Sequence, residues 1–250
     1  MNNNPLQSVN EPKAHLNIRI VNTKPEHAEA LEHMQTLIYP MLSRDELFTA
    51  EKYLNQIRLF PEGQFVALAD INGHEEIVGA TTTFRIQFDF NHPQHRFVEI
   101  VADGWLTHHD PHGEWLYGAS IEVLPEFRRM GICGRLYSAR RDLIHRLNLR
   151  GEITGGMLPG YKDYKGSMTV DEFVWNVVNG TAYCPTLTTQ LKNGFQVKGV
   201  LHDYVTDPDA QDCCSLLVRE NRDYIPEHIL PVRVRINRDT RFRMLIPRSA

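Results

Sequence analysis

One short segment, Arg128 to Gly134, constrains the fold of this chain more than any other feature. It reads Arg-Arg-Met-Gly-Ile-Cys-Gly, and it lies between an apolar, strand-like run that ends at Leu124 and a long amphipathic helical pattern. The backbone N–H groups in the first turn of a helix have no partner within the helix, so they can bind phosphate oxygens. Small residues let a ligand approach the backbone closely. The segment therefore predicts a strand–turn–helix unit that holds a phosphorylated ligand.

Apolar periodicity predicts strands and helices along most of the chain. The expected strands cover residues 16–21, 65–70, 77–84, 115–124, 153–157, 195–205 and 214–219, with a further extended segment near 97–102. The expected helices cover residues 23–38, 43–59, 133–148, 169–178 and 186–193. Capping boxes mark the starts of three helices, and Asn72-Gly73 indicates a hairpin turn. The order predicts an α/β sandwich with one mixed sheet; it argues against a doubly wound fold, because the phosphate turn follows the fourth strand rather than the first.

The predicted domain covers residues 16–220. Residues 1–15 are polar and contain Asn and Pro, so we expect them to be disordered. Residues 221–250 are expected to form a C-terminal extension that packs on the domain or on a partner. Within the domain, residues 158–185 are typical of a helical insertion.

Composition excludes several classes of protein. A net charge of −4 over 250 residues gives no case for nucleic-acid binding. The four cysteines show no C-x-x-C spacing, which favours free thiols in a reducing compartment. No apolar run approaches the ~18 residues that a membrane helix needs, and the N-terminus lacks the features of a signal peptide. We therefore expect a cytoplasmic protein that binds neither nucleic acid nor membrane.

The turn and the element order resemble the GNAT superfamily of acyl-CoA-dependent N-acyltransferases. The signature of that family, Gln/Arg-x-x-Gly-x-Gly/Ala after the fourth strand, is matched by Arg128, Gly131 and Cys133, with Cys in place of Gly or Ala. The lead-in Val-Leu-Pro-Glu-Phe-Arg-Arg, residues 123–129, is similar to the family's V-x-P-x-x-R-G. Asn-Gly-Phe at 193–195 resembles the Leu-Gly-Phe that ends the family's fourth helix.

The resemblance covers roughly residues 18–220. Three segments, 146–151, 155–161 and 190–195, are similar to the GNAT-type domains fused to nitrilase-like carbon–nitrogen hydrolases. No hydrolase half accompanies them, so a free-standing relative is expected. The family implies a mixed, mostly antiparallel central sheet of about seven strands, with helices on both faces.

The resemblance also implies a reaction. Acetyl-CoA would be the co-substrate, with no metal, and the acyl group would pass by direct attack to the primary amine of a small-molecule or amino-acid-like acceptor. The implied cofactor-binding residues are Ile121, Val123, Arg128, Arg129, Met130, Gly131, Ile132, Cys133 and Gly134. The insertion, residues 158–185, would cover the acceptor side. Two alternatives stay open, a non-catalytic acyl-CoA-binding sensor or interaction module and an enzyme for protein lysines or N-termini; a homodimer is also open.

Glu122 is the predicted general base, since it lies among apolar neighbours on the strand next to the cradle. A buried carboxylate there is either paired with an arginine or has a raised pKa suited to base catalysis, and both interpretations stay open. The family often places a tyrosine, as the acid for the leaving thiolate, where this chain has Gln190, which is no proton source. The tyrosines considered in its place are Tyr161, Tyr183, Tyr164 and Tyr204, and the first two are predicted to be catalytic.

Two further patterns have plainer interpretations. Cys133 could be a reactive thiol at a helix N-terminus, but a small residue tolerated in the turn is favoured. The segment 108–112, His-His-Asp-Pro-His, resembles a metal site in composition only. Its spacing matches no standard site, so a polar loop near the acceptor cleft is favoured.

Overall fold

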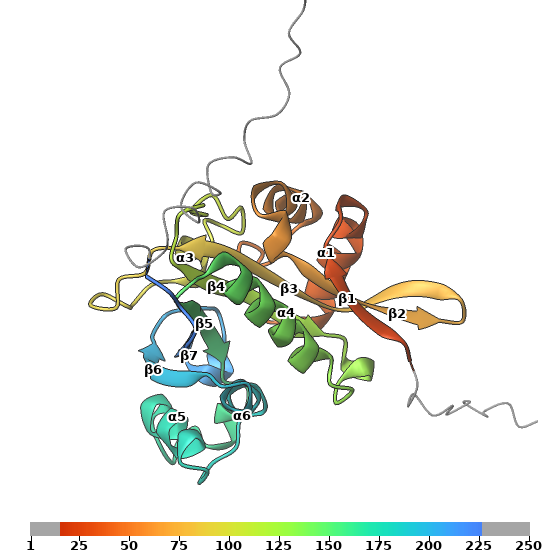
Figure 1. The fold of residues 1–250 in the computed structure, drawn as a ribbon. Helices are drawn as coiled ribbons and strands as arrows, with labels where there is room; N and C mark the ends of the chain where they lie inside the picture. Colours follow the sequence, from red (N-terminus) through yellow and green to blue (C-terminus); the bar gives the residue numbers. More distant parts are fainter. Residues whose placement is uncertain (1–15, 227–250) are drawn as a thin grey trace, which may run out of the picture.

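The computed structural model describes residues 16–226 and shows one seven-stranded mixed sheet with helices on both faces (Figure 1). The strands are β1 (Ile18–Asn22), β2 (Phe65–Ile71), β3 (His74–Ile86), β4 (Trp115–Val123), β5 (Gly151–Met157), β6 (Gln196–Leu201) and β7 (Cys214–Glu220). The helices are α1 (Ala28–Ile38), α2 (Ala50–Leu59), α3 (Phe97–Ile100), α4 (Ile132–Leu147), α5 (Val170–Val178) and α6 (Pro185–Lys192).

The strand order is β1-β2-β3-β4-β5-β7-β6, and every neighbouring pair is antiparallel except β4 with β5. The predicted fold class is thus confirmed. The expectations for residues 1–15 and for 227–250 lie outside the described residues. Within residues 16–226, no helix has the length and apolar character needed to cross a membrane.

Side-chain alternation along β2 explains how one sheet supports a core on each face. Val66 and Leu68 join the core that contains α1 and α2. Phe65, Ala67 and Ala69 point the opposite way and join the core that contains α4. Helices α1 and α2 therefore cover one face of the sheet, and α4 covers the other.

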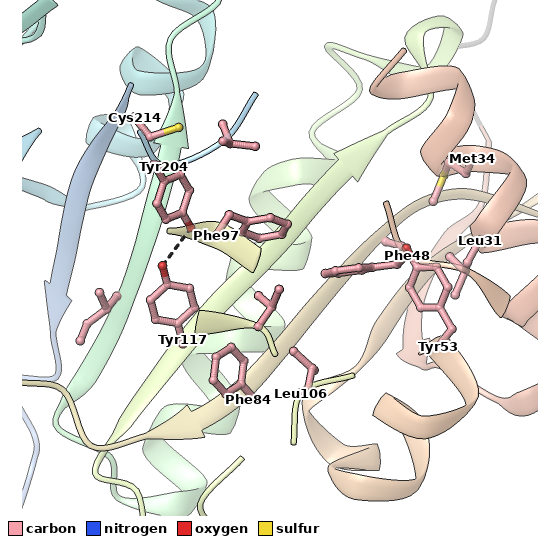
Figure 2. Close-up of a cluster of buried hydrophobic side chains, with 14 of the residues drawn as sticks. Leu31, Met34, Phe48, Tyr53, Phe84, Phe97, Leu106, Tyr117, Tyr204 and Cys214 are labelled. Carbon is pink, nitrogen blue, oxygen red and sulfur yellow. Dashed lines mark hydrogen bonds between the residues drawn. The ribbon is translucent and has the colours of Figure 1, made fainter. Parts of the chain in front are cut away.

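The core on the α1–α2 face is aromatic (Figure 2). Phe48 packs edge-on against Tyr53 and stacks with Phe97, with ring centroids 5.8 and 5.9 Å apart. Phe84 packs against Tyr117 at 5.3 Å. Aromatic side chains bury large areas at low conformational cost, so this core is a rigid wall for the cleft that opens beside it.

A separate core forms where α5 and α6 pack at the β6 end of the sheet (Figure 1). The predicted capping box at Thr169 is present, because Thr169 Oγ1 accepts from the Glu172 N–H while the Glu172 carboxylate accepts from the Thr169 N–H. Gly180 follows α5 with a φ of +76°, a value that favours glycine. The insertion therefore packs at the sheet edge.

Several element boundaries differ from the sequence prediction. The helix expected from Thr23 begins as α1 at Ala28, after a 3-10 turn over Pro25–His27 whose N-cap is Lys24 rather than Thr23. The strand expected over 195–205 is shorter, because β6 ends at Leu201. Helix α2 begins after Thr49 rather than at Ser43. The Glu46 carboxylate accepts from the Ser43 N–H, as a capping box requires, but it also accepts from the backbone N–H of Thr206 at 2.6 Å. That long-range bond accompanies a turn rather than a helix over residues 43–46. The extended segment expected near 97–102 is instead the short helix α3.

Candidate functional site

Strands β4 and β5 separate in the middle of the sheet. They pair only over residues 115–118 and 151–154, although β4 continues to Val123 and β5 to Met157. Beyond that point the outer edges stay paired with β3 and β7. The inner edges of both strands are therefore open to a ligand.

A bulge and a hydrogen bond fix the point of separation. Gly118 lies opposite Thr83 and Ser120 opposite Thr82, so Ala119 is an extra residue in β4. The Thr154 hydroxyl donates to the Gly118 carbonyl at 2.7 Å and closes the vertex of the wedge. The bulge turns β4 away from β5 just where the gap begins.

A cleft opens at this wedge. Its walls come from α1, the α1–α2 connection, α3, β4, β5, α6 and the segment after β6. The lining residues are Gln35, Tyr39, Leu42, Glu46, Phe48, Phe97, Ala119, Ser120, Ile121, Thr154, Gly155, Met157, Thr186, Gln190, Tyr204 and Val205. Among them are four aromatic side chains and one carboxylate, and none is Lys, Arg or His. The cleft is thus mostly apolar with a few polar groups, as small-molecule sites are.

The predicted phosphate turn directly follows β4. Arg129 and Gly131 have φ values of +65° and +77°, and Gly131 is the N-cap of α4. The first backbone bond of this helix is from Arg135 N to the Gly131 carbonyl; within the described part of the chain, no N–H of residues 129–134 has an acceptor. A Cβ at Gly131 or Gly134 would meet nothing within 4 Å, so the turn borders open space. Six backbone donors are therefore available to an anion.

The other predicted cofactor residues divide by position. Arg128 is exposed, and its Nε donates to the Val123 carbonyl at 3.2 Å. Ile121 lines the cleft, whereas Ile132 is buried in the α4 core. Cys133 is half-buried, and burial raises its pKa to about 11. The thiol therefore stays protonated near neutral pH, which agrees with the interpretation of Cys133 as a small residue rather than a reactive one.

Glu122 lies one side chain behind the cleft wall. It is 2% exposed and accepts from Gln35 Nε2 at 3.2 Å, from the Tyr53 hydroxyl at 3.4 Å and from the Tyr39 hydroxyl at 3.5 Å. Burial raises its pKa to about 7, against the opposing effects of Ser120, of the Gln35 and Tyr53 hydrogen bonds and of the Arg140 charge. No Lys or Arg among residues 16–226 forms an ion pair with it. Of the two interpretations left open, the raised pKa agrees with the structure.

Arg140 pairs with a different carboxylate. Its Nη1 donates to Glu152 at 2.6 Å, and Arg219 Nη2 donates to the second Glu152 oxygen at 2.5 Å. All three side chains are buried. Arg140 also donates to Thr81 Oγ1 through Nε at 2.7 Å and to the Ser120 carbonyl through Nη2. The triad thus fixes the β4 backbone at the bulge.

Two adjacent glycines in β5 let polar side chains approach the wedge from opposite faces. A Cβ at Gly155 would lie 2.7 Å from the Tyr204 hydroxyl oxygen, and one at Gly156 would lie 2.5 Å from Gln190 Oε1. Gln190 is 3% exposed, and its Oε1 has no hydrogen-bond partner within the described chain. The residue at the family's tyrosine position therefore reaches the cleft, but its amide cannot supply a proton to a leaving group.

The two favoured tyrosines do not line the cleft. Tyr161 is buried and donates to the Met168 carbonyl at 3.0 Å, whereas Tyr183 is 62% exposed. No residue of 158–185 is among the lining residues, so the insertion does not cover the cleft as expected. Tyr204, one of the other two candidates, lines it instead. No local pattern in the sequence indicates this, because the position depends on a turn between β6 and β7 in which Tyr204 N donates to the Asp212 carbonyl.

One residue of the histidine-rich segment, His109, is part of the packing, whereas His108 and His112 are exposed. None of residues 108–112 lines the cleft, so the loop does not border it as expected. His109 stacks on Phe60 with ring centroids 4.7 Å apart, and its Nδ1 accepts from the Arg85 N–H. Burial lowers the His109 pKa to about 4, so this imidazole is neutral at physiological pH. Among residues 16–226, no group of three or more His, Cys, Asp or Glu side chains is placed to hold a metal ion.

Two proteins of Bacillus subtilis strain 168 are similar in sequence. The probable hydrolase YhcX is 38% identical over 183 residues, which are 73% of this chain and 35% of YhcX. The chain therefore spans about a third of the length of that relative. The uncharacterized N-acetyltransferase YkwB is 30% identical over 197 residues, which are 78% of this chain and 85% of YkwB. No family model matches the sequence.

Two solved structures share the fold. The loading GNATL domain of CurA from Lyngbya majuscula has a TM-score of 0.68 at 20% identity, over 81% of this chain and 97% of that domain. The GphF GNAT-like decarboxylase in complex with isobutyryl-CoA has a TM-score of 0.66 at 19% identity, over 81% and 98%. At these identities the likeness is one of architecture.

Proposed function

This chain belongs to the GNAT superfamily of acyltransferases, and from that premise we propose that it transfers the acetyl group of acetyl-CoA to a primary amine by direct attack. One observation carries the proposal: the gap between β4 and β5 opens next to a turn whose six backbone N–H groups, those of residues 129–134, have no acceptor within the described residues. A ligand with a phosphorylated end and a slender arm fits that combination.

The turn is suited to the diphosphate of CoA. The N–H groups of residues 129–134 would bind its oxygens at the start of α4, and the exposed side chains of Arg128 and Arg129 would add positive charge. Cys133 contributes a backbone N–H like any other residue, so its departure from the family signature leaves the cradle intact. The arm of the co-substrate would follow the open edge of β4 at Ile121 into the wedge.

Glu122 is suited to prepare the attacking nitrogen. An amine attacks only when neutral, and a base with a pKa of about 7 is partly ionised at physiological pH and can take the proton. The carboxylate is buried but contacts Gln35 and Tyr39, which both line the cleft. Proton transfer through a single water at these side chains would connect it to the acceptor.

The cleft also favours one kind of acceptor. Phe48, Phe97 and Tyr204 offer aromatic surface, and the Glu46 carboxylate adds negative charge. Hydrogen bonds from the backbone of Thr206 and Ser43 outweigh burial and keep the Glu46 pKa below its ordinary value. With no basic side chain in the lining to pair with a carboxylate, we propose a small cationic amine with an apolar body rather than an anionic amino-acid-like acceptor.

Two measurements test the proposal. Acetyl-CoA at about 100 times its dissociation constant should raise the free energy of unfolding by ~2.7 kcal/mol, seen as a higher melting temperature. Release of the CoA thiol should then depend on an added amine, with arylalkylamines ahead of amino acids. Absence of both stabilisation and release with any acyl-CoA would overturn the function.

A non-catalytic acyl-CoA sensor is the second candidate, and it is favoured by Gln190, whose amide cannot act as an acid. It predicts stabilisation by CoA without thiol release over the whole amine panel. Turnover that is lost in Glu122→Gln while CoA binding persists would exclude it.

A further inference from the structure

A chain of three hydrogen-bonded side chains leads away from the cleft (Figure 2 shows its two tyrosines). Tyr204 lines the cleft, and its hydroxyl lies 2.9 Å from that of Tyr117, which is fully buried. The Tyr117 hydroxyl lies 2.7 Å from His95 Nε2, and His95 Nδ1 lies 2.7 Å from the Pro93 carbonyl. His95 is half-buried in the loop before α3, so the chain runs from the cleft toward the surface.

Elementary hydrogen-bond rules determine which group is the donor in each of these three hydrogen bonds. The Pro93 carbonyl can only accept, so His95 Nδ1 carries a hydrogen. In the neutral imidazole Nε2 then accepts, and Tyr117 must donate to it. Because the Tyr117 proton is committed to His95, Tyr204 must donate to Tyr117. The Tyr204 oxygen also accepts from the Gly155 backbone, and its remaining lone-pair capacity can accept a proton from a ligand in the cleft.

We propose that Tyr204, Tyr117 and His95 form a proton relay that takes a proton from the attacking amine. The proposal rests on the acyl-transfer function. As the nitrogen–carbonyl bond forms and the carbon–sulfur bond breaks, the nitrogen proton passes to Tyr204, the Tyr204 proton to Tyr117 and the Tyr117 proton to His95 Nε2. The product is a neutral amide, and His95 becomes an imidazolium that returns its proton to the departing thiolate or to solvent. Tyr204 is the catalytic residue, and the other two act through it.

The surroundings suit a relay of this direction. Burial raises the pKa of Tyr204 and of Tyr117 well above the usual range, so both hydroxyls pass protons without becoming stable phenolates. Burial lowers the His95 pKa below its usual 6.5, against the Pro93 carbonyl and the Glu99 charge, so the imidazole starts neutral. The other titratable group near the tyrosines is the buried thiol of Cys214. Neither the Glu99 carboxylate nor the Cys214 thiol is a cation that would oppose a proton arriving at His95.

The relay complements Glu122 rather than duplicating it. An ammonium acceptor must lose one proton before attack and a second once the new bond has formed. Glu122 approaches the cleft through Gln35 and Tyr39 on α1 and its C-terminal end, whereas Tyr204 approaches it from the segment after β6. Glu122 therefore takes up the first of the two protons, and Tyr204 takes up the second.

Hydroxyl deletion tests the relay. Tyr117→Phe and Tyr204→Phe should each lower kcat at least about tenfold with unchanged KM for acetyl-CoA. Tyr161→Phe is the matched control, since it removes the hydrogen-bonded hydroxyl of another buried tyrosine outside the cleft and should leave kcat unchanged. Added imidazole should restore turnover to His95→Ala but not to His95→Ala combined with Tyr117→Phe. Wild-type kcat in Tyr117→Phe, or equal rescue of both, would overturn the relay.

The pH profile and the tautomer give independent readouts. As the pH is lowered, kcat should decrease first near pH 7, where Glu122 takes up a proton. It should decrease more steeply below the lowered pKa of His95. His95→Gln should abolish only this second decrease. Nitrogen-15 NMR of the free wild-type protein should show His95 protonated at Nδ1. Protonation at Nε2 alone would overturn the relay even if the protein proved not to turn over, a result that would instead refute acyl transfer.

Discussion

Replacing Glu122 by glutamine should make the protein more stable and less active, and the stability gain should depend on pH. The folded-state pKa of Glu122 is about 7, raised from 4.5, so the folded state holds this proton more tightly than the unfolded chain. Between pH 4.5 and 7 the unfolded chain has lost the proton while the folded state keeps it, so stability falls as pH rises through this window. A shift of this size corresponds to about 3 kcal/mol at pH 8. The glutamine side chain of the variant cannot ionise, so the variant should escape that loss.

Urea unfolding at pH 4 and pH 8 measures the effect. The variant's advantage over the wild type should grow by about 3 kcal/mol between these two values. Glu29→Gln, an exposed change on α1, is the control and should stay within about 0.5 kcal/mol of the wild type. Kcat of Glu122→Gln should fall by roughly 10²–10⁴ with acetyl-CoA binding retained. An advantage that is equal at both pH values would refute the burial of an ionisable Glu122, and an unchanged kcat would refute its role as base.

Three further changes follow from the contacts around the wedge. Arg140→Met leaves a buried Glu152 with one partner and should cost about 3–5 kcal/mol, measured by the urea midpoint; a loss under about 1 kcal/mol would contradict it. Gly131→Val places a branched side chain at a φ of +77° and should cost about 1–2 kcal/mol while weakening the thermal shift by CoA, and an unaltered shift would argue against the cradle. Gln190→Leu removes an unpartnered buried oxygen and should raise stability by about 1 kcal/mol with turnover retained; destabilisation would indicate a partner for Oε1.

Much of the fold could be predicted because its signals are local. The Asn72-Gly73 turn, the apolar stripe of α4 and the capping box at Thr169 each depend on residues close together in the chain. Prediction was wrong at residues 43–49, where a hydrogen bond from Thr206 to Glu46 joins segments 160 residues apart. Local propensity carries no information about such a partner. The homodimer and the cytoplasmic location stay predictions.

The candidate site divides in the same way. The turn at 128–134 is one contiguous segment, so its residue types and its place after the fourth strand indicate an anion site by themselves. The buried Glu122 could also be anticipated from its apolar neighbours, although both of its interpretations remained open. No local signal in the sequence places Tyr161 or Tyr183 at the cleft, and in the structure neither side chain lines it.

By itself, the sequence determined the strand–turn–helix cradle and the family, because backbone donors at a helix start need only the right local residues. Tertiary structure alone decided which side chains meet at the wedge. Because Gly155 has no side chain, the ring of Tyr204, some 50 residues later in the sequence, can pack against β5 at this position. The same packing brings the Tyr204 hydroxyl to that of Tyr117. Proton-transfer groups act through distances of about 3 Å, and such distances between remote residues arise only when the sheet has formed.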